Sequence, residues 1–202
     1  LEIYGWYVSE GWTANNTRIG IANTNTVFVD RIEQLVNNMG YNSRVQKQDR
    51  KDSQYKPCYN IWIYNKQLTT LINSSFGRGC DNKHLPPWVF DLSNKQLIPL
   101  MRGLFLGDGS KFITGGRIYI SYTTKSKTLI VQLWQLLTRF GLIACVQHNK
   151  KKNAWKLSFS IRGGDLDDVS TWKQSDYKQR WRTDDDNIYL PIRKIEQIDY
   201  DD

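Results

Sequence analysis

The chain is poor in the residues that hold small secreted or metal-stapled proteins together. It has only two histidines in 202 residues and three cysteines, an odd number at wide spacing (Cys58, Cys80 and Cys145). We therefore expect reduced thiols and no disulfide framework. Cys80 and His84 are four positions apart, but a structural zinc site needs about four ligands, and the chain has no CxxC pair to complete such a set.

Long apolar runs and acidic residues are also scarce. No apolar run approaches the roughly 20 residues of a membrane-spanning helix, and no secretory signal is recognisable. We expect an intracellular protein, neither secreted nor in a membrane, that acts in a prokaryotic cytoplasm, a nucleus or an organelle. The chain has 28 Lys and Arg against 20 Asp and Glu, a net charge of +8. This excess favours a polyanionic partner, although many basic proteins bind no nucleic acid.

The sequence repeats itself. The stretch IYGWYVSEG (3–11) returns as MRGLFLGDG (101–109), with Gly third, a small residue seventh, an acid eighth and Gly ninth. After each motif come a strand pattern, an amphipathic helix pattern that ends on Gly, and another strand pattern. The matching stretches are RIGIANT with RIYISYT, VFVDRIEQLVNNMG with TLIVQLWQLLTRFG, and CYNIWIY with AWKLSFS.

This order predicts an α+β protein of two pseudo-symmetric αββαββα repeats, each with a four-stranded antiparallel sheet. We place the first repeat at 1–82, a linker with a Pro-Pro break at 83–98, and the second repeat with a C-terminal extension at 99–202. NKQLTTLINSSFG and LDDVSTWKQ are expected to form the short closing helices. Each half alone is small for a stable core, so the two should share one buried face.

Small residues recur inside both motifs. Gly5 and Ser9 are four positions apart, and so are Gly103 and Gly107. A glycine inside a helix costs about 1 kcal/mol relative to Ala, whereas a ridge of small residues lets two helix backbones approach closely. A single buried helix with incidental glycines is the alternative. The recurrence at equivalent positions favours a seam between two helices.

Such a seam would bring two acids together. Glu10 and Asp108 would emerge side by side, each in the last turn of its helix. There the helix dipole disfavours an anion, and the two carboxylates repel each other. A divalent cation removes both penalties, and oxygen ligands suit a hard ion such as Mg²⁺. We interpret Glu10 and Asp108 as metal ligands, in a site of the kind that activates water for phosphodiester cleavage.

The two motifs resemble the signature helices of the LAGLIDADG homing endonucleases of the double-motif type, and the resemblance covers nearly the whole chain. Within that family the chain is most similar to an intein endonuclease domain. NKHLPPWVF (82–90) resembles a Lys-x-Ile-Pro block, and IYLPIRKIEQIDYDD (188–202) resembles the segment that leads back into the splicing domain. The splicing residues are absent, so the chain as given should not splice.

The resemblance implies a monomer that cuts a long, asymmetric double-stranded DNA target and leaves short 3′ overhangs. It implies Mg²⁺ as the cofactor, with Mn²⁺ or Ca²⁺ as substitutes. The metal would be held by Glu10 and Asp108 with help from the backbone carbonyls of Ser9 and Gly107.

The resemblance also implies a basic residue near each active site and a polar residue beside the metal-bound water. Lys83 matches the first basic position, and Lys178, 95 positions later, is our candidate for the second. A surface or phosphate-contacting role is the alternative for both lysines. Asn23 fits the polar role in the first repeat. Its counterpart by sequence, Tyr122, does not, which makes the half-sites unequal and leaves open faster cleavage of one strand.

The two sheets would form a DNA-binding saddle, with every second side chain directed toward the duplex. Basic residues cluster in equivalent hairpins of both repeats. Such hairpin tips are often merely solvated, but the recurrence favours contacts to phosphates and bases that weaken with salt. The predicted DNA-binding residues are Arg18, Arg44, Lys47, Arg50, Lys51 and Lys56 in the first repeat, and Arg117, Lys150, Lys151, Lys152 and Lys156 in the second.

Other functions stay open on the same fold. One is an RNA maturase or a catalytically inactive nucleic-acid-binding relic. The intact Glu10 and Asp108 argue against a decayed relic, but some maturases keep these acids. Another is a DNA-binding regulator, which would normally carry an added helix-turn-helix for which the chain has no room. We expect an active endonuclease.

Overall fold

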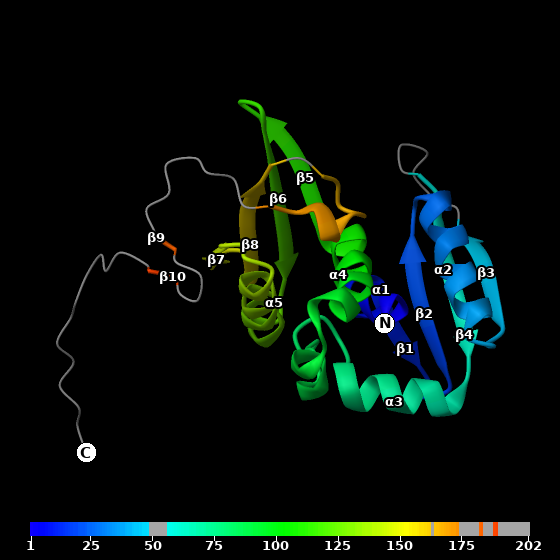
Figure 1. Cartoon of the computed structure of the whole chain (residues 1–202). Coiled ribbons are helices and arrows are strands. Elements are labelled where there is room, and N and C mark those ends of the chain that lie inside the picture. Colours follow the sequence, from blue (N-terminus) through cyan, green and yellow to red (C-terminus); the bar gives the residue numbers. More distant parts are fainter. Residues whose placement is uncertain (49–55, 163, 174–181, 184–187, 190–202) are drawn as a thin grey trace, which may run out of the picture.

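Two four-stranded sheets lie on either side of a central pair of helices (Figure 1). The computed structural model describes residues 1–48, 56–162, 164–173, 182–183 and 188–189. The first repeat contains α1 (Glu2–Glu10), β1 (Gly11–Ala14), β2 (Arg18–Asn23), α2 (Thr26–Asn38), β3 (Ser43–Gln48), β4 (Cys58–Tyr64) and α3 (Lys66–Phe76). The second contains α4 (Asn94–Asp108), β5 (Gly109–Thr114), β6 (Arg117–Thr124), α5 (Lys127–Arg139), β7 (Cys145–Asn149) and β8 (Ala154–Ile161).

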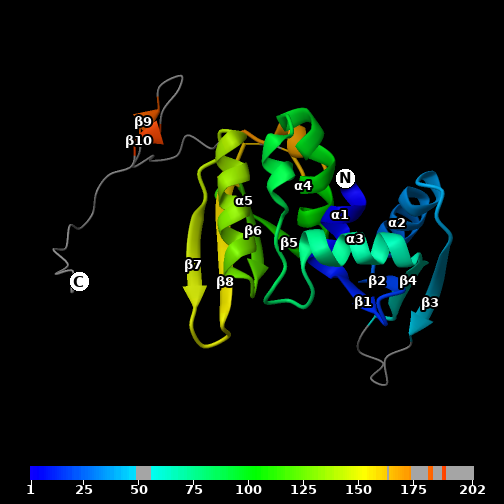
Figure 2. The ribbon, with the colours of Figure 1, turned by 90° about the horizontal axis from the view of Figure 1, so that it is seen from below.

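The two sheets have the same topology. Their strand orders are β1-β2-β4-β3 and β5-β6-β8-β7, and every neighbouring pair is antiparallel. One face of each sheet packs against the amphipathic helix of its repeat, α2 or α5 (Figure 2). The strand alternation explains this, since Ile19 and Ile21 on β2 and Ile61 and Ile63 on β4 are all buried. The predicted fold class is confirmed.

The segments that join and close the repeats differ in detail from the expectation. A Ser93–Gln96 capping box starts α4 at Asn94, inside the stretch we placed in the linker, and the 3₁₀ helix η1 (Pro87–Asp91) precedes it. The closing helix α3 is present, but its expected counterpart over 166–174 is a three-residue 3₁₀ helix, η2 (Val169–Thr171), in the residues described up to position 173.

Local polar contacts explain the short second closing element. The Asp168 carboxylate accepts a 2.6 Å hydrogen bond from Ser170, and the Asp168 carbonyl accepts one of 2.8 Å from the Thr171 hydroxyl. Side chains that bond to nearby groups in this way favour turns over helix. Farther along, β9 (Arg182–Thr183) and β10 (Ile188–Tyr189) pair antiparallel. None of the helices in the described part of the chain has the length and apolar character needed to cross a bilayer.

The central helices α1 and α4 touch through their backbones. A Cβ atom added at Gly5 would lie 2.3 Å from the carbonyl oxygen of Leu100, and one at Gly103 would lie 2.4 Å from the carbonyl oxygen of Glu2. At the far end of the same seam, a Cβ at Gly107 would lie 2.1 Å from Ser9 Oγ. The regular spacing of the small residues therefore reflects two helix backbones that lie too close together for a larger residue at Gly5, Gly103 or Gly107.

We expect Gly5→Ala to destabilise the protein by about 3 kcal/mol, because the new methyl group pushes against rigid backbone and outweighs the better helix propensity of Ala. In thermal denaturation this should lower the midpoint by about 10 °C for a chain of this size. Gln67→Ala on the exposed face of α3 is the control and should change little. A midpoint for Gly5→Ala at or above the wild-type value would contradict the close seam.

Candidate active site

Two carboxylates meet where α1 and α4 end. Glu10 is the last residue of α1, and Asp108 is the last residue of α4. Burial, followed by the charge of Asp108, raises the pKa of Glu10 to about 7. Burial raises the pKa of Asp108 to about 6, opposed by the Tyr122 hydroxyl and by the charge of Lys83. The structure therefore holds two mutually repelling acids, one from each repeat, in a partly desolvated position.

Lys83 lies against the same end of α1. Its Nζ donates hydrogen bonds to the carbonyl oxygens of Tyr7 (2.6 Å) and Gly11 (3.0 Å) and lies 3.2 Å from the centre of the Tyr7 ring. Only 4% of the residue is exposed. Burial lowers the pKa of Lys83 to about 7, against the raising effect of the Asp108 charge. Lys83 thus belongs to the same electrostatic cluster as the two acids.

The second repeat fixes the backbone that carries Lys83. Ser126, the N-cap of α5, donates a 2.6 Å hydrogen bond to the carbonyl oxygen of Lys83. The side-chain amide of Gln132 exchanges two 2.7 Å hydrogen bonds with the backbone of Leu85. The Lys83 side chain contacts α1 of the first repeat, so the cluster exists only when both repeats are docked.

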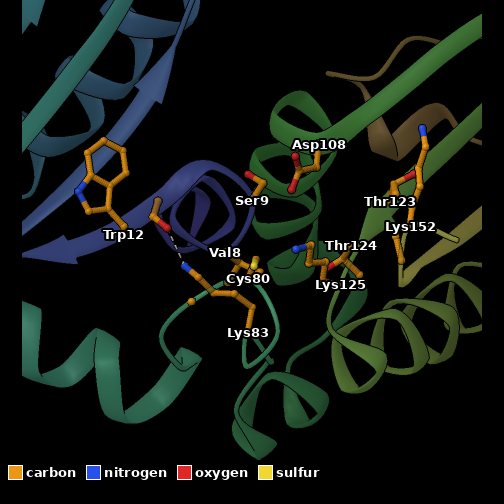
Figure 3. Close-up of a pocket in the computed structure, with 13 residues that line it drawn as sticks. Val8, Ser9, Trp12, Cys80, Lys83, Asp108, Thr123, Thr124, Lys125 and Lys152 are labelled. Carbon is orange, nitrogen blue, oxygen red and sulfur yellow. Dashed lines mark hydrogen bonds between the residues drawn. The ribbon is translucent and has the colours of Figure 1, made fainter. Parts of the chain in front are cut away.

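A hollow opens beside these groups, with walls from both repeats (Figure 3). Among its lining residues are Ser9, Gly11, Trp12, Cys80 and Lys83 on one side, and Asp108, Thr123, Thr124, Lys125 and Lys152 on the other. Sequence reasoning missed Trp12 and Lys125. Lys125 directly precedes Ser126, the N-cap of α5. No local sequence pattern marks this position, and Lys125 lines the hollow only because of the way α5 docks.

The residues present fit a hard divalent cation. Two carboxylates with raised pKa values gain most from a positive ion between them. Beside them the hydroxyl of Tyr122 is buried without a hydrogen-bond partner. No group of three or more His, Cys, Asp or Glu forms a metal cluster among the residues that the structure describes. Backbone carbonyls, water or substrate phosphates would have to complete the shell, as is usual for Mg²⁺.

The strand register corrects our comparison of the two repeats. β1 pairs Gly11 with Ile21, whereas β5 pairs Gly109 with Tyr122. Because these glycines are equivalent in the two motifs, the structural counterpart of Tyr122 is Ile21 and not Asn23. The sequence comparison differs from the structural one because the two hairpins differ in length: β1 and β2 form four residue pairs, whereas β5 and β6 form six. The Asn23 side chain accepts a 2.9 Å hydrogen bond from the backbone of Asn25.

The predicted DNA-binding residues that the structure describes lie on the strands and turns of the two sheets. The Arg18 guanidinium lies 4.4 Å from the centre of the Trp62 ring, and Arg44 pairs with Trp62 across neighbouring strands. Lys47 is in β3, Lys56 precedes β4, Arg117 begins β6, Lys150, Lys151 and Lys152 form the β7–β8 turn, and Lys156 is in β8. Arg50, Lys51 and the candidate second basic residue Lys178 lie outside the described residues.

The chain is similar in sequence to known proteins, over the second repeat in one comparison and over most of the chain in others. Residues 96–188 match the sequence profile of the LAGLIDADG-like domain. The chain is 24% identical over 213 residues to an uncharacterized protein of Methanocaldococcus jannaschii (98% of this chain, 23% of the relative). It is 28% identical over 153 residues to the RNA polymerase subunit Rpo1C of that organism (76% and 17%), and 23% identical over 182 residues to RecA of Mycobacterium tuberculosis (82% and 22%). It spans less than a quarter of each of these relatives.

Solved structures with the same fold include nucleases bound to DNA. The homing endonuclease I-DmoI in complex with DNA and Ca superposes with a TM-score of 0.57 at 13% identity (80% of this chain, 82% of that one). I-WcaI bound to its DNA recognition sequence gives 0.57 at 14% (78% and 73%). Full-length WhiA from Thermotoga maritima gives 0.57 at 14% (78% and 48%). The chain has the two-domain LAGLIDADG fold.

The buried acids predict how stability depends on pH. Folding raises the pKa of Glu10 to about 7 and that of Asp108 to about 6. Because the folded state binds these protons more tightly than the unfolded state, they add to the free energy of unfolding, and the addition is complete below about pH 4. That contribution is lost as the pH rises through the folded-state values. Glu10→Gln cannot ionise. It should match the wild type at pH 4 and exceed its stability by about 1 kcal/mol at pH 8.

Thermal denaturation in EDTA at the two pH values measures this difference. The exposed acid Asp30, replaced in Asp30→Asn, is the control and should show no such pH-dependent gain. If Glu10→Gln were less stable than the wild type at pH 8, the mutual repulsion of the two carboxylates would be contradicted.

Proposed function

We propose that the protein is a divalent-metal-dependent endonuclease that cuts both strands of a specific double-stranded DNA site. The observation that carries this proposal is the meeting of Glu10 and Asp108, one from each repeat, beside Lys83 and a shared hollow. A pseudo-twofold protein matches the twofold relation of the two DNA strands. One acid from each half suits a protein that cleaves both strands at a single site.

The residues of the site divide the chemistry between them. Glu10 and Asp108 would hold Mg²⁺, with the carbonyl oxygens of Ser9 and Gly107 as further ligands. When bound, the ion activates water and stabilises negative charge on the leaving oxygen. Lys83, with a pKa of about 7, can hold or release a proton at Nζ near neutral pH. Asn23 and Lys178 keep their proposed roles as the water-orienting and second basic residues.

The sheet faces opposite α2 and α5 are the proposed DNA-binding surface. On the first sheet, Trp12 and Trp62 pack edge to face at 5.3 Å; on the second, Phe112 and Tyr119 stack at 5.0 Å. Arg18, Arg44, Arg117 and Lys156 alternate with the buried residues of their strands and so lie on these faces. Lys47 does not, because it is in register with Tyr59 and lies on the other face of its sheet. Since the two faces carry different side chains, the preferred target should be asymmetric. The DNA complexes of I-DmoI and I-WcaI support this partner and a metal-dependent reaction.

The relatives support an origin as an inserted domain of the intein type. The chain matches a minor part of an RNA polymerase subunit, a DNA helicase and RecA, between 13% and 22% of their lengths. A polymerase subunit, a helicase and RecA differ in their reactions, so one shared reaction does not explain a common segment. An endonuclease domain that spreads between host genes explains a shared stretch of this size, and it agrees with the Lys-x-Leu-Pro block around Lys83.

The likeness to WhiA, including its LAGLIDADG domain alone, favours a second candidate, a DNA-binding protein that does not cut. The fold is common to both possibilities, so it does not discriminate between them. The paired acids do, because a DNA-binding surface gains nothing from two buried carboxylates that repel phosphate.

Asp108→Asn should abolish cleavage and leave DNA binding nearly unchanged, because the amide keeps the shape of the side chain but cannot hold the ion. Duplexes from a randomised library are first enriched by binding in Ca²⁺ and then tested for cutting in Mg²⁺. We expect a loss of cleavage rate on the order of a hundredfold or more and an affinity within about twofold of wild type by fluorescence anisotropy in Ca²⁺.

Asp91→Asn, an exposed acid at the end of η1, is the matched control and should cut normally. Unchanged cutting by Asp108→Asn would exclude the paired-acid site. Tight, specific binding by a wild-type chain that never cuts in Mg²⁺ or Mn²⁺ would favour the non-cutting candidate.

A further inference from the structure

Tyr122 has a buried hydroxyl that nothing in the fold explains. The residue is fully buried, and its Oη has no hydrogen-bond partner. Its ring packs edge to face on Phe105 of α4 at 5.5 Å, a contact that a phenylalanine would make equally well. A hydroxyl left unpaired in a core destabilises the protein, and such departures from good packing are expected at functional sites.

The hydroxyl lies beside the paired acids. Tyr122 is opposite Gly109, the residue that follows Asp108, in the β5–β6 ladder. The charges of Asp108 and Glu10 both act on its phenol group, and of the two acids Asp108 directly precedes the residue that Tyr122 faces in the ladder. A neutral O–H next to an ionised carboxylate can only donate to it. We therefore expect the Tyr122 hydroxyl to donate its hydrogen to a carboxylate oxygen of Asp108.

The first repeat has no such donor. Ile21 occupies the equivalent place opposite Gly11, and it is as fully buried as Tyr122. At this position the second repeat therefore has a hydroxyl donor that the first repeat lacks. The pseudo-twofold symmetry of the backbone is therefore broken at the site itself.

We propose that Tyr122 is a positioning residue that donates its hydroxyl hydrogen to Asp108 and orients that carboxylate toward the bound cation. Groups that orient metal ligands in this way strengthen cation binding. Because Ile21 cannot do the same for Glu10, the two halves of the centre are unequal, and the two DNA strands are cut at different rates. The inference rests on the proposed metal-dependent cleavage.

Tyr122→Phe tests this, with Tyr59→Phe as the matched control, a strand tyrosine packed against the core of the first repeat. The first readout is Mn²⁺ affinity of the full chain, measured by electron paramagnetic resonance, with the melting midpoint in EDTA as a check on folding. We expect Tyr122→Phe to weaken Mn²⁺ binding about tenfold while its midpoint in EDTA stays close to the wild-type value, because the ring keeps its packing on Phe105. Tyr59→Phe should leave the affinity unchanged.

The second readout is the ratio of the two strand-cleavage rates on a library-selected duplex with a different label on each strand. We expect the wild type to accumulate a nicked intermediate and Tyr122→Phe to change the ratio severalfold. Wild-type affinity and an unchanged ratio in Tyr122→Phe would overturn the proposal, and so would a wild type that binds no Mn²⁺. A wild type that binds Mn²⁺ but cuts no DNA would contradict cleavage and its strand preference, and the affinity comparison would then decide the positioning role alone.

Discussion

The backbone contact between α1 and α4 is the constraint on which the rest of the structure depends. Gly5 and Gly103 allow a distance at which an added Cβ would lie 2.3–2.4 Å from a carbonyl oxygen of the other helix. Because Glu10 and Asp108 each lie five positions after the seam glycine of their own helix, the two helices also end side by side. Glu10 and Asp108 therefore share one place, and the two sheets are held on either side of it (Figure 1).

The site that results is poor for stability and suited to a cation. Two acids and Lys83 are desolvated together, which brings the pKa values of all three to between about 6 and about 7. Contacts between the repeats hold the surroundings of these groups together: Ser126 of α5 donates a hydrogen bond to the Lys83 carbonyl, and Gly107 leaves room for Ser9. Buried charge of this kind is typical of functional sites and not of structural cores.

Internal repetition made most of the fold predictable. The alternating strands around Arg18 and Arg117 lie where the sequence pattern indicates, and so do the helices α2 and α5, which end two residues before Gly40 and Gly141. What the pattern could not show was hairpin length. Two extra residue pairs in the β5–β6 hairpin shift the counterpart of Tyr122 to Ile21, and only the ladder reveals this. Lys125 was missed because its position depends on how α5 docks, which no local signal encodes.

The central claim is that the seam brings Glu10 and Asp108 to one shared metal ion. Crystals of the full chain with a library-selected duplex and Mn²⁺, measured at the manganese absorption edge, test it directly. The anomalous map should place Mn²⁺ within ligand distance, about 2.2 Å, of both carboxylates. Manganese bound by only one of the two acids, or found only away from the ends of α1 and α4, would contradict the claim.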